Sequence, residues 1–176
     1  VNWKWLSGDH IVEQHVHNID VFLWMSGLKV KSATGVGSRQ RRVTGDQYDN
    51  FSIDFECENG VHFHSMCRQI DGCSSNVGEI VFGTKGVWSS YDESIKDYDG
   101  NVLWAFDWDG ERAAHPQFDP YTLEHVDAIN HIRKGEGLDE AEACAMSCLA
   151  GIMGREAAYT GRTVTWDEMS QSEQNL

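Results

Sequence analysis

Residues 51–69 read FSIDFECENGVHFHSMCRQ, and this stretch decides the fold class. Apolar and polar residues alternate over 51–58, as they do in a strand with one buried face. The dipeptide Asn59-Gly60 is the pair that two-residue hairpin turns favour, and a second extended run follows over 61–69. We therefore predict an antiparallel hairpin. A two-residue turn then puts every second residue of the return strand on the apolar face: His62, His64, Met66 and Arg68.

A helix is predicted ahead of the hairpin, over residues 9–25. Ser7 or Asp9 can cap its start, and Gly27 ends it. One side of this helix is apolar along its whole length, so it has a core to pack on. A short strand over 30–34 comes next, followed by a polar, glycine-rich loop over 35–49.

The rest of the chain divides into strands and then helices. Strands are predicted at 79–84, 86–91 and 102–108. Helices are predicted from Asp119-Pro120 to Lys134 and over 138–159, and a last short strand over 163–166. The order of helix, antiparallel strands and helices predicts a single α+β domain over 1–176, in which helices pack on one face of an open, mostly antiparallel sheet.

The composition restricts the classes of partner. The chain has 176 residues and a formal net charge of −14, which argues against nucleic acid and anionic membrane surfaces, because both require a basic face. No apolar run approaches the roughly 20 residues of a membrane span. The chain starts at Val1 rather than Met, so we expect a piece of a longer protein and infer neither a cytoplasmic nor an exported location. Its five cysteines form no CxxC pair, and we expect them to be small buried residues.

Four ionisable residues follow one line along the first predicted helix, at spacings of three, four and three: His10, Glu13, His17 and Asp20. At roughly 100° per residue they fall on one face. Histidine is the usual general acid or base at neutral pH, and a nearby carboxylate orients it. The same row is also compatible with a solvated polar face. His15 falls on the apolar side, where a buried, hydrogen-bonded structural histidine is expected.

Metal and nucleotide motifs are incomplete. Glu13 with His17, or His62 with His64, could supply two metal ligands, but a third and fourth are not evident, so we predict no metal site. Gly35-Val36-Gly37 lacks the third glycine of a dinucleotide-binding fingerprint. Arg68 is compatible both with a paired structural arginine and with a substrate contact.

The segment from Gly8 to Asp20, GDHIVEQHVHNID, resembles the helix that opens the C-terminal domain of Gfo/Idh/MocA oxidoreductases, the relatives of glucose–fructose oxidoreductase and inositol dehydrogenase. The family pattern has an acidic residue, a histidine four later and an aspartate three after that, which match Glu13, His17 and Asp20. Further segments are similar to a sugar-oxidoreductase-like subgroup: 66–72, 83–86, 124–127 and 154–161.

The resemblance implies a fold like the C-terminal domain of glyceraldehyde-3-phosphate dehydrogenase. It also implies an N-terminal Rossmann domain outside this chain, which would bind most of the NAD or NADP. In the family the exposed sheet face commonly forms the homo-oligomer interface. By the same resemblance, His17 would be the acid–base residue and Glu13 its partner, and Asp20 would support the site and bind substrate; His10 and Arg68 are further candidate substrate contacts.

We therefore expect the substrate-binding and oligomerisation domain of an NAD(P)-dependent oxidoreductase that acts on a sugar or cyclitol, inactive as an isolated fragment. Two alternatives remain open at this point. One is a domain of an enzyme that uses transient oxidation to cleave a glycosidic bond. The other is a non-catalytic module that assembles through its sheet.

Overall fold

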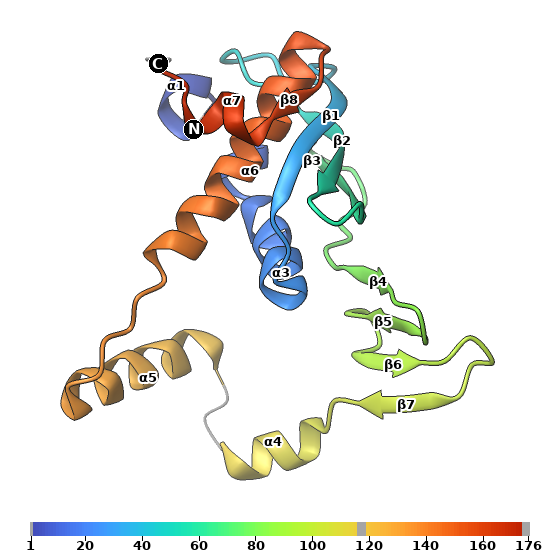
Figure 1. The fold of residues 1–176 in the computed structure, drawn as a ribbon, viewed down its shortest axis with the longest axis vertical. Helices are drawn as coiled ribbons and strands as arrows, with labels where there is room; N and C mark the ends of the chain where they lie inside the picture. Colours follow the sequence, from blue (N-terminus) through green and yellow to red (C-terminus); the bar gives the residue numbers. More distant parts are fainter. Residues whose placement is uncertain (1, 116–118, 174–176) are drawn as a thin grey trace. The chain divides into compact units, whose positions relative to one another are not determined.

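A computed structural model describes residues 2–115 and 119–173, and the chain divides into two compact units (Figure 1). The first unit combines the N-terminal residues up to Ser75 with the C-terminal segment that starts at Ala141, and the second unit spans Asn76–Glu140. Each unit is treated by itself below.

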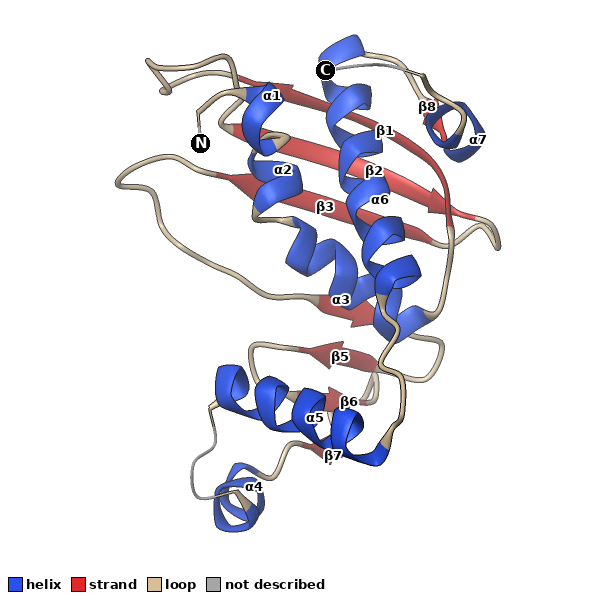
Figure 2. Cartoon of the chain, turned by 90° about the vertical axis from the view of Figure 1, so that its left-hand side faces the viewer, coloured by secondary structure: helices blue, strands red, loops and turns tan. Residues whose placement is uncertain are grey.

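The first unit contains a four-stranded antiparallel sheet in the order β3-β2-β1-β8. The strands are β1 (Val30–Ser38), β2 (Asn50–Cys57), β3 (His62–Arg68) and β8 (Val164–Thr165). The helices are α1 (Lys4–Ser7), α2 (His10–Glu13), α3 (Val16–Ser26), α6 (Ala141–Thr160) and α7 (Trp166–Ser170). Helices α2, α3 and α6 cross one face of the sheet, as Figure 2 shows. The α+β class with an open antiparallel sheet and helices on one face is thereby confirmed.

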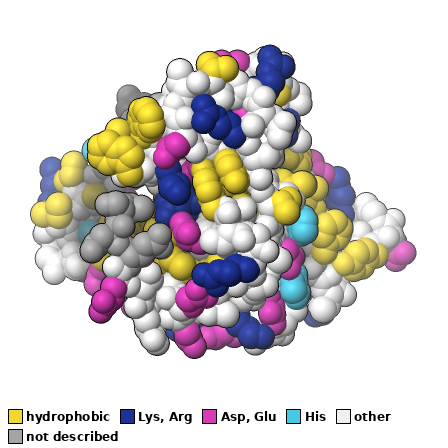
Figure 3. Space-filling view, turned by 90° about the horizontal axis from the view of Figure 1, so that it is seen from above, with side chains coloured by type: hydrophobic (Ala, Val, Ile, Leu, Met, Phe, Trp, Pro, Cys, Tyr) yellow, Lys and Arg dark blue, Asp and Glu magenta, His cyan; other side chains and the backbone are white. Residues whose placement is uncertain are grey.

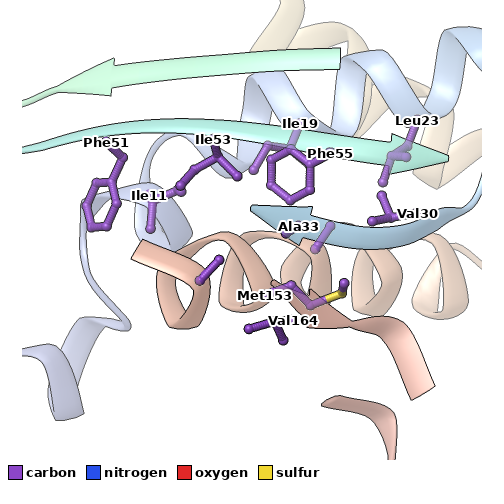
Figure 4. Packing of buried hydrophobic residues seen from close by; sticks show 12 residues of the cluster. Ile11, Ile19, Leu23, Val30, Ala33, Phe51, Ile53, Phe55, Met153 and Val164 are labelled. Atoms are coloured by element: carbon purple, nitrogen blue, oxygen red, sulfur yellow. The ribbon is translucent and has the colours of Figure 1, made fainter. Parts of the chain in front are cut away.

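The core of this unit lies between the sheet and those helices (Figure 4). Phe51, Ile53 and Phe55 point from β2 toward Ile11 of α2 and Met153 of α6, and all five are at least 97% buried. A Cβ added at Gly154 of α6 would lie 2.9 Å from Cζ of Phe55. The helix can approach the sheet this closely because that position has no side chain.

The hairpin is confirmed, but its predicted register is wrong by one residue. Phe55 pairs with Phe63, and Asp54 pairs with His64. The turn explains the difference: the Cys57 N–H donates to the carbonyl of Val61, so the loop has three residues with Gly60 at φ +78°, not two. A one-residue slip moves every side chain of a strand to the other face. Four side chains of β3 therefore lie on the outer face, away from the helices: His62, His64, Met66 and Arg68.

Two further boundaries differ from the predictions. Strand β1 continues to Ser38, because residues 35–38 pair with β2. The predicted loop over 35–49 is therefore shorter than expected. The predicted helix over 9–25 is interrupted after Glu13. There the N–H of His15 bonds to the carbonyl of His10, five residues back, at 3.0 Å. Such a wide turn inserts one extra residue and changes the direction of the side chains after it.

The second unit is an antiparallel meander followed by two helices. Its strands are β4 (Ile80–Phe82), β5 (Val87–Ser89), β6 (Ser94–Lys96) and β7 (Val102–Ala105), in that order. Its helices are α4 (Trp108–Ala114) and α5 (Pro120–Lys134). The sequence predicts α5 well, including its start at Pro120 and its end before Gly135. It misses β6 and α4, which are only three and seven residues long.

The cysteines are all free, and the expectation that they are buried is wrong for two of them. Cys57 is buried and Cys67 and Cys148 are half-buried, whereas Cys73 and Cys144 are exposed.

Among the helices of the described residues, none combines the length and apolar character that a membrane crossing requires.

Candidate functional site

Glu13 and His17 flank the interruption between α2 and α3. Glu13 is the last residue of α2 and His17 the second of α3, and both side chains are exposed. Neither forms a side-chain hydrogen bond or ion pair with the part of the chain that the structure describes. These two groups are therefore available to a ligand in a way that paired groups are not.

The other two histidines of this region are held by the protein. His15 Nε2 lies 2.7 Å from the Ser65 hydroxyl of β3. Burial, together with a smaller effect of the nearby His10, lowers the pKa of His15 to about 4, so the imidazole is neutral at physiological pH. The expectation of a hydrogen-bonded histidine at position 15 is confirmed, although its side chain is half-buried rather than buried. His17 is therefore the exposed histidine of this segment.

His10 is only 3% exposed and packs against the ring of Phe51, with centroids 5.0 Å apart. Its Nδ1 donates to the Tyr48 carbonyl at 3.3 Å and lies 3.3 Å from Asp9 Oδ1. Its Nε2 is buried without a partner among the described residues. Direct contact between His10 and a substrate stays a prediction, and it would require the ring to turn outward.

Asp9 anchors the start of α2 and is fully buried. Its carboxylate accepts hydrogen bonds from the His10 N–H (2.7 Å), the Tyr159 hydroxyl (2.7 Å) and the Tyr48 N–H (3.2 Å). Burial alone would raise the pKa of Asp9, but the bonds from His10 and Tyr159 outweigh it and the pKa is lowered. Burial, with Asp9 beside it, raises the pKa of Tyr159. Asp9 has φ +81°, a strained conformation for a residue with a side chain.

A second buried carboxylate orders the basic loop between β1 and β2. Asp49 Oδ2 accepts three backbone N–H bonds, from Gln40, Arg41 and Arg42, at 2.6–2.9 Å. Burial opposes ionisation of Asp49, but these donors, with Asn50, lower its pKa to about 2. Arg42 in turn donates to Gln47 and to Asn2. The loop is thus held in one conformation.

The remaining predicted site residues lie in different places. Asp20 is exposed on α3, where its Oδ1 accepts a 2.6 Å hydrogen bond from the buried Ser147 of α6. Arg68 lies on the outer face of the sheet and donates to the Ser74 carbonyl at 2.7 Å. The fold therefore brings Glu13, His17 and Asp20 to the helix side of the sheet, and Arg68 to the opposite side.

His62 and His64, considered above as metal ligands, share one carboxylate instead. Asp54 of β2 lies between them, 2.7 Å from Nδ1 of His62 and 3.3 Å from Nδ1 of His64. No group of three or more potential metal ligands occurs within residues 2–115 and 119–173.

Elsewhere on the surface, hydrophobic side chains reach solvent among acidic and basic ones, as the view from above in Figure 3 shows.

Sequence reasoning missed the network of Asp9, Tyr48 and Tyr159. Asp9 and Tyr159 are 150 positions apart, and a spacing pattern cannot connect them. The one local signal is Gly8, which precedes Asp9 and shares its positive φ. Two successive residues with positive φ mark a tight turn. In the sequence alone, however, a glycine before a helix is too common to reveal such a turn.

Comparison with protein families identifies a match to the GFO/IDH/MocA C-terminal domain over residues 1–89. No curated protein matches the chain. Among solved structures, the fold is similar to myo-inositol 2-dehydrogenase from Lactobacillus plantarum, with 17% identity and a TM-score of 0.67 over 91% of this chain and 49% of that one.

Two further structures show the same fold. Scyllo-inositol dehydrogenase from Lactobacillus casei, with bound NAD(H) and scyllo-inositol, has 16% identity and a TM-score of 0.65 over 90% of this chain and 48% of its own. UDP-N-acetylglucosamine 3-dehydrogenase from Acidithiobacillus ferrooxidans has 16% identity and a TM-score of 0.68 over 90% and 50%. The chain spans about half the length of these proteins. Since the family model matches half of the chain, the chain belongs to the GFO/IDH/MocA family and corresponds to its C-terminal domain.

Proposed function

We propose that this chain is the substrate-binding and acid–base part of an NAD(P)-dependent oxidoreductase that acts on a sugar or a cyclitol. The observation that carries the proposal is a contrast along one segment. His10 and His15 are held by protein groups, whereas Glu13 and His17 are exposed and have no side-chain partner within residues 2–115 and 119–173. An exposed imidazole is suited to exchange a proton with a substrate hydroxyl.

In the proposed mechanism, His17 accepts the proton of a secondary hydroxyl during oxidation and returns it during reduction. Glu13 is the proposed carboxylate partner of His17 at the substrate. Asp20, fixed by Ser147, supports the same face and contacts the substrate, and His10 and Arg68 are the further proposed contacts. Because Arg68 lies on the outer sheet face, its contact is the part of this set that most needs a separate test.

The nicotinamide group, when bound, supplies the hydride acceptor or donor. The residues of this chain do not fit the pyrophosphate, because Gly35 and Gly37 lie inside β1 and pair with β2 rather than forming a turn before a helix. We therefore assign NAD(P) binding mainly to an N-terminal Rossmann domain outside this chain. It follows that the chain alone would not oxidise its substrate.

Relatives of the same fold are dehydrogenases of inositols and of a UDP-linked amino sugar. These compounds all carry secondary hydroxyl groups on a six-membered ring. We take a polyhydroxylated ring as the substrate class. We also propose that the parent protein is a homo-oligomer that associates through an open sheet face.

The test uses the full-length protein with NAD and NADP, and with myo-inositol, scyllo-inositol and UDP-N-acetylglucosamine as substrates. His17→Gln should lower kcat by about 10²–10⁴-fold with a smaller change in KM, because a general acid–base group acts in the transition state. Glu13→Gln should lower kcat less and shift its pH profile.

His64→Gln is the matched control, since His64 is also exposed but lies on the outer sheet face. It should leave kcat unchanged. Turnover of His17→Gln within a few-fold of wild type would remove His17 from the acid–base role.

A further inference from the structure

Two cysteines lie one turn apart at the start of α6, Cys144 and Cys148. Side chains at positions i and i+4 share one face of a helix, with Cβ atoms about 5–6 Å apart. The Cys148 thiol hydrogen-bonds to the sulfur of Cys144, so the two side chains are in direct contact. The other three cysteines lie outside α6. The sequence and the fold therefore create one pair of thiols.

The two members of the pair differ in their access to solvent. Cys144 is exposed, whereas Cys148 is half-buried. Burial, together with the neighbouring Cys144 and Asp20, raises the pKa of the Cys148 thiol. An oxidant reaches an exposed sulfur first, and a thiol next to it then resolves the oxidised sulfur to a disulfide. Cys144 is thus suited to be oxidised and Cys148 to resolve it.

The pair lies beside the proposed substrate-binding face. Ser147, between the two cysteines in the sequence, is buried and donates a 2.6 Å hydrogen bond to Asp20 Oδ1 of α3. The carboxylate of Asp20 is also near enough to Cys148 to influence its pKa. A change in the turn that carries both cysteines therefore reaches Asp20 directly.

A disulfide between Cys144 and Cys148 requires a change in the helix. Its Cβ atoms must come within about 3.5–4.5 Å, which is closer than an intact helix places them. Cys144 is the fourth residue of α6, and the residues at 135–140 ahead of the helix are exposed. The first N–H groups of a helix have no partner inside it, so the first turn unwinds at the cost of few hydrogen bonds. A disulfide formed in this way is strained and easily reduced.

We propose that Cys144 and Cys148 form a reversible disulfide when the protein meets hydrogen peroxide, and that this bond weakens the contact of Ser147 with Asp20. Residues 145–147 lie inside the ring that the disulfide closes, so the backbone of Ser147 moves when the ring forms. The effect on the substrate rests on the proposed function, in which Asp20 contacts it. The pair then acts as a redox control of substrate binding.

The oxidation proceeds in two steps. The Cys144 thiolate attacks one oxygen of hydrogen peroxide, the O–O bond breaks, and Cys144 becomes a sulfenic acid as hydroxide leaves. The Cys148 thiolate then attacks the sulfur of Cys144, the S–S bond forms, and a second hydroxide leaves. The protons given up by the two thiols convert both hydroxides to water. Two electrons pass from the thiols to the peroxide.

The chemical test treats the full-length protein with hydrogen peroxide and then with dithiothreitol. Mass spectrometry of the peptide that contains both cysteines should show the loss of two hydrogen atoms, restored by dithiothreitol. Hydrogen exchange at the amides of residues 145–147 should accelerate in the oxidised form. Cys144→Ser and Cys148→Ser should prevent both changes. Cys73→Ser is the matched control, because Cys73 is exposed but lies outside α6, and it should leave both changes intact.

The functional test measures KM and kcat before and after oxidation. Loss of the Ser147 hydrogen bond to Asp20 should raise KM about three- to tenfold, with a smaller change in kcat. Ser147→Ala should raise the KM of the reduced enzyme by a similar factor, and oxidation should then raise it no further. Cys144→Ser should keep the KM of the reduced wild type under both conditions.

Other outcomes overturn the inference. If Cys144 gains oxygen atoms or links to another molecule without bonding to Cys148, the pair is not a disulfide site. If the disulfide forms while KM and the exchange of residues 145–147 stay unchanged, its coupling to Asp20 is refuted. If the reduced protein oxidises none of the substrates, the proposed function fails, while the peptide mass and the hydrogen exchange still decide whether the disulfide forms and disturbs α6.

Discussion

At the scale of single residues, burial and hydrogen bonding separate four ionisable residues that the sequence places in one row: His10, Glu13, His17 and Asp20. His10 is buried and Asp20 accepts a hydrogen bond from Ser147, whereas Glu13 and His17 are exposed and have no side-chain partner among the described residues. The spacing of these residues is visible in the sequence. Their roles depend on which side of α2 and α3 packs against the sheet. The extra residue at the helix interruption changes which residues of α3 lie on that side.

The lowered pKa of His15 predicts a pH dependence of stability. Its pKa falls from 6.5 to about 4 on folding, so between these values the unfolded chain binds more protons than the folded one. The stabilising contribution of the neutral imidazole is complete above pH 6.5, and it is lost as the pH falls toward 4. Its size is on the order of 2 kcal/mol.

The measurement is urea unfolding at pH 7 and pH 5. His15→Gln keeps a group that can bond to Ser65 but does not titrate, so the free energy of unfolding should fall less between these two pH values than it does in wild type. An equal fall in both proteins would show that burial of His15 does not contribute. His64→Gln, at an exposed position, is the control.

At the scale of elements, the contact between α6 and the sheet determines where α2 and α3 lie. Gly151 and Gly154 are both buried on α6, but their surroundings differ. A Cβ at Gly154 would meet Phe55 at 2.9 Å and Ile11 at 3.2 Å, whereas a Cβ at Gly151 would meet nothing closer than 3.5 Å.

Gly154→Ala should therefore destabilise the protein by about 1–3 kcal/mol, because the added methyl group overpacks a core that cannot move aside. Gly151→Ala should be neutral or stabilising by up to about 1 kcal/mol, since alanine favours the helix. Thermal unfolding of the two variants compares them directly. Equal melting temperatures would contradict the close contact at Gly154.

At the scale of the whole molecule, the two units differ in how they are stabilised. The first unit has a continuous core, whereas the apolar residues of the second unit remain partly or largely exposed in the single chain. Local stability follows the density of buried apolar contacts. The second unit should therefore be the less stable of the two.

Hydrogen exchange tests this difference. In a monomeric state, the amides of β4–β7 should exchange on the order of 100-fold faster than those of β1–β3. Equal protection of the two sheets in the monomer would mean that the second unit is stable by itself.

The sequence alone determines those features that depend on near neighbours in the chain. Alternation identifies β2 and β3, Pro120 and Gly135 mark the two ends of α5, and the segment from Gly8 to Asp20 identifies the family. Each signal is local, because strand period, helix caps and motif spacing involve residues only a few positions apart.

The tertiary structure alone decides which side chains are available for chemistry. The three-residue turn at Gly60 places Arg68 on the outer sheet face, and the wide turn at His15 puts Glu13 and His17 on different helices. The hydroxyl of Tyr159 bonds to Asp9 across 150 positions. The physical reason is that exposure and hydrogen bonding depend on contacts between elements. A shift of one residue in a turn exchanges the two faces of the strand that follows, and one extra residue in a helix rotates the side chains after it by about 100°.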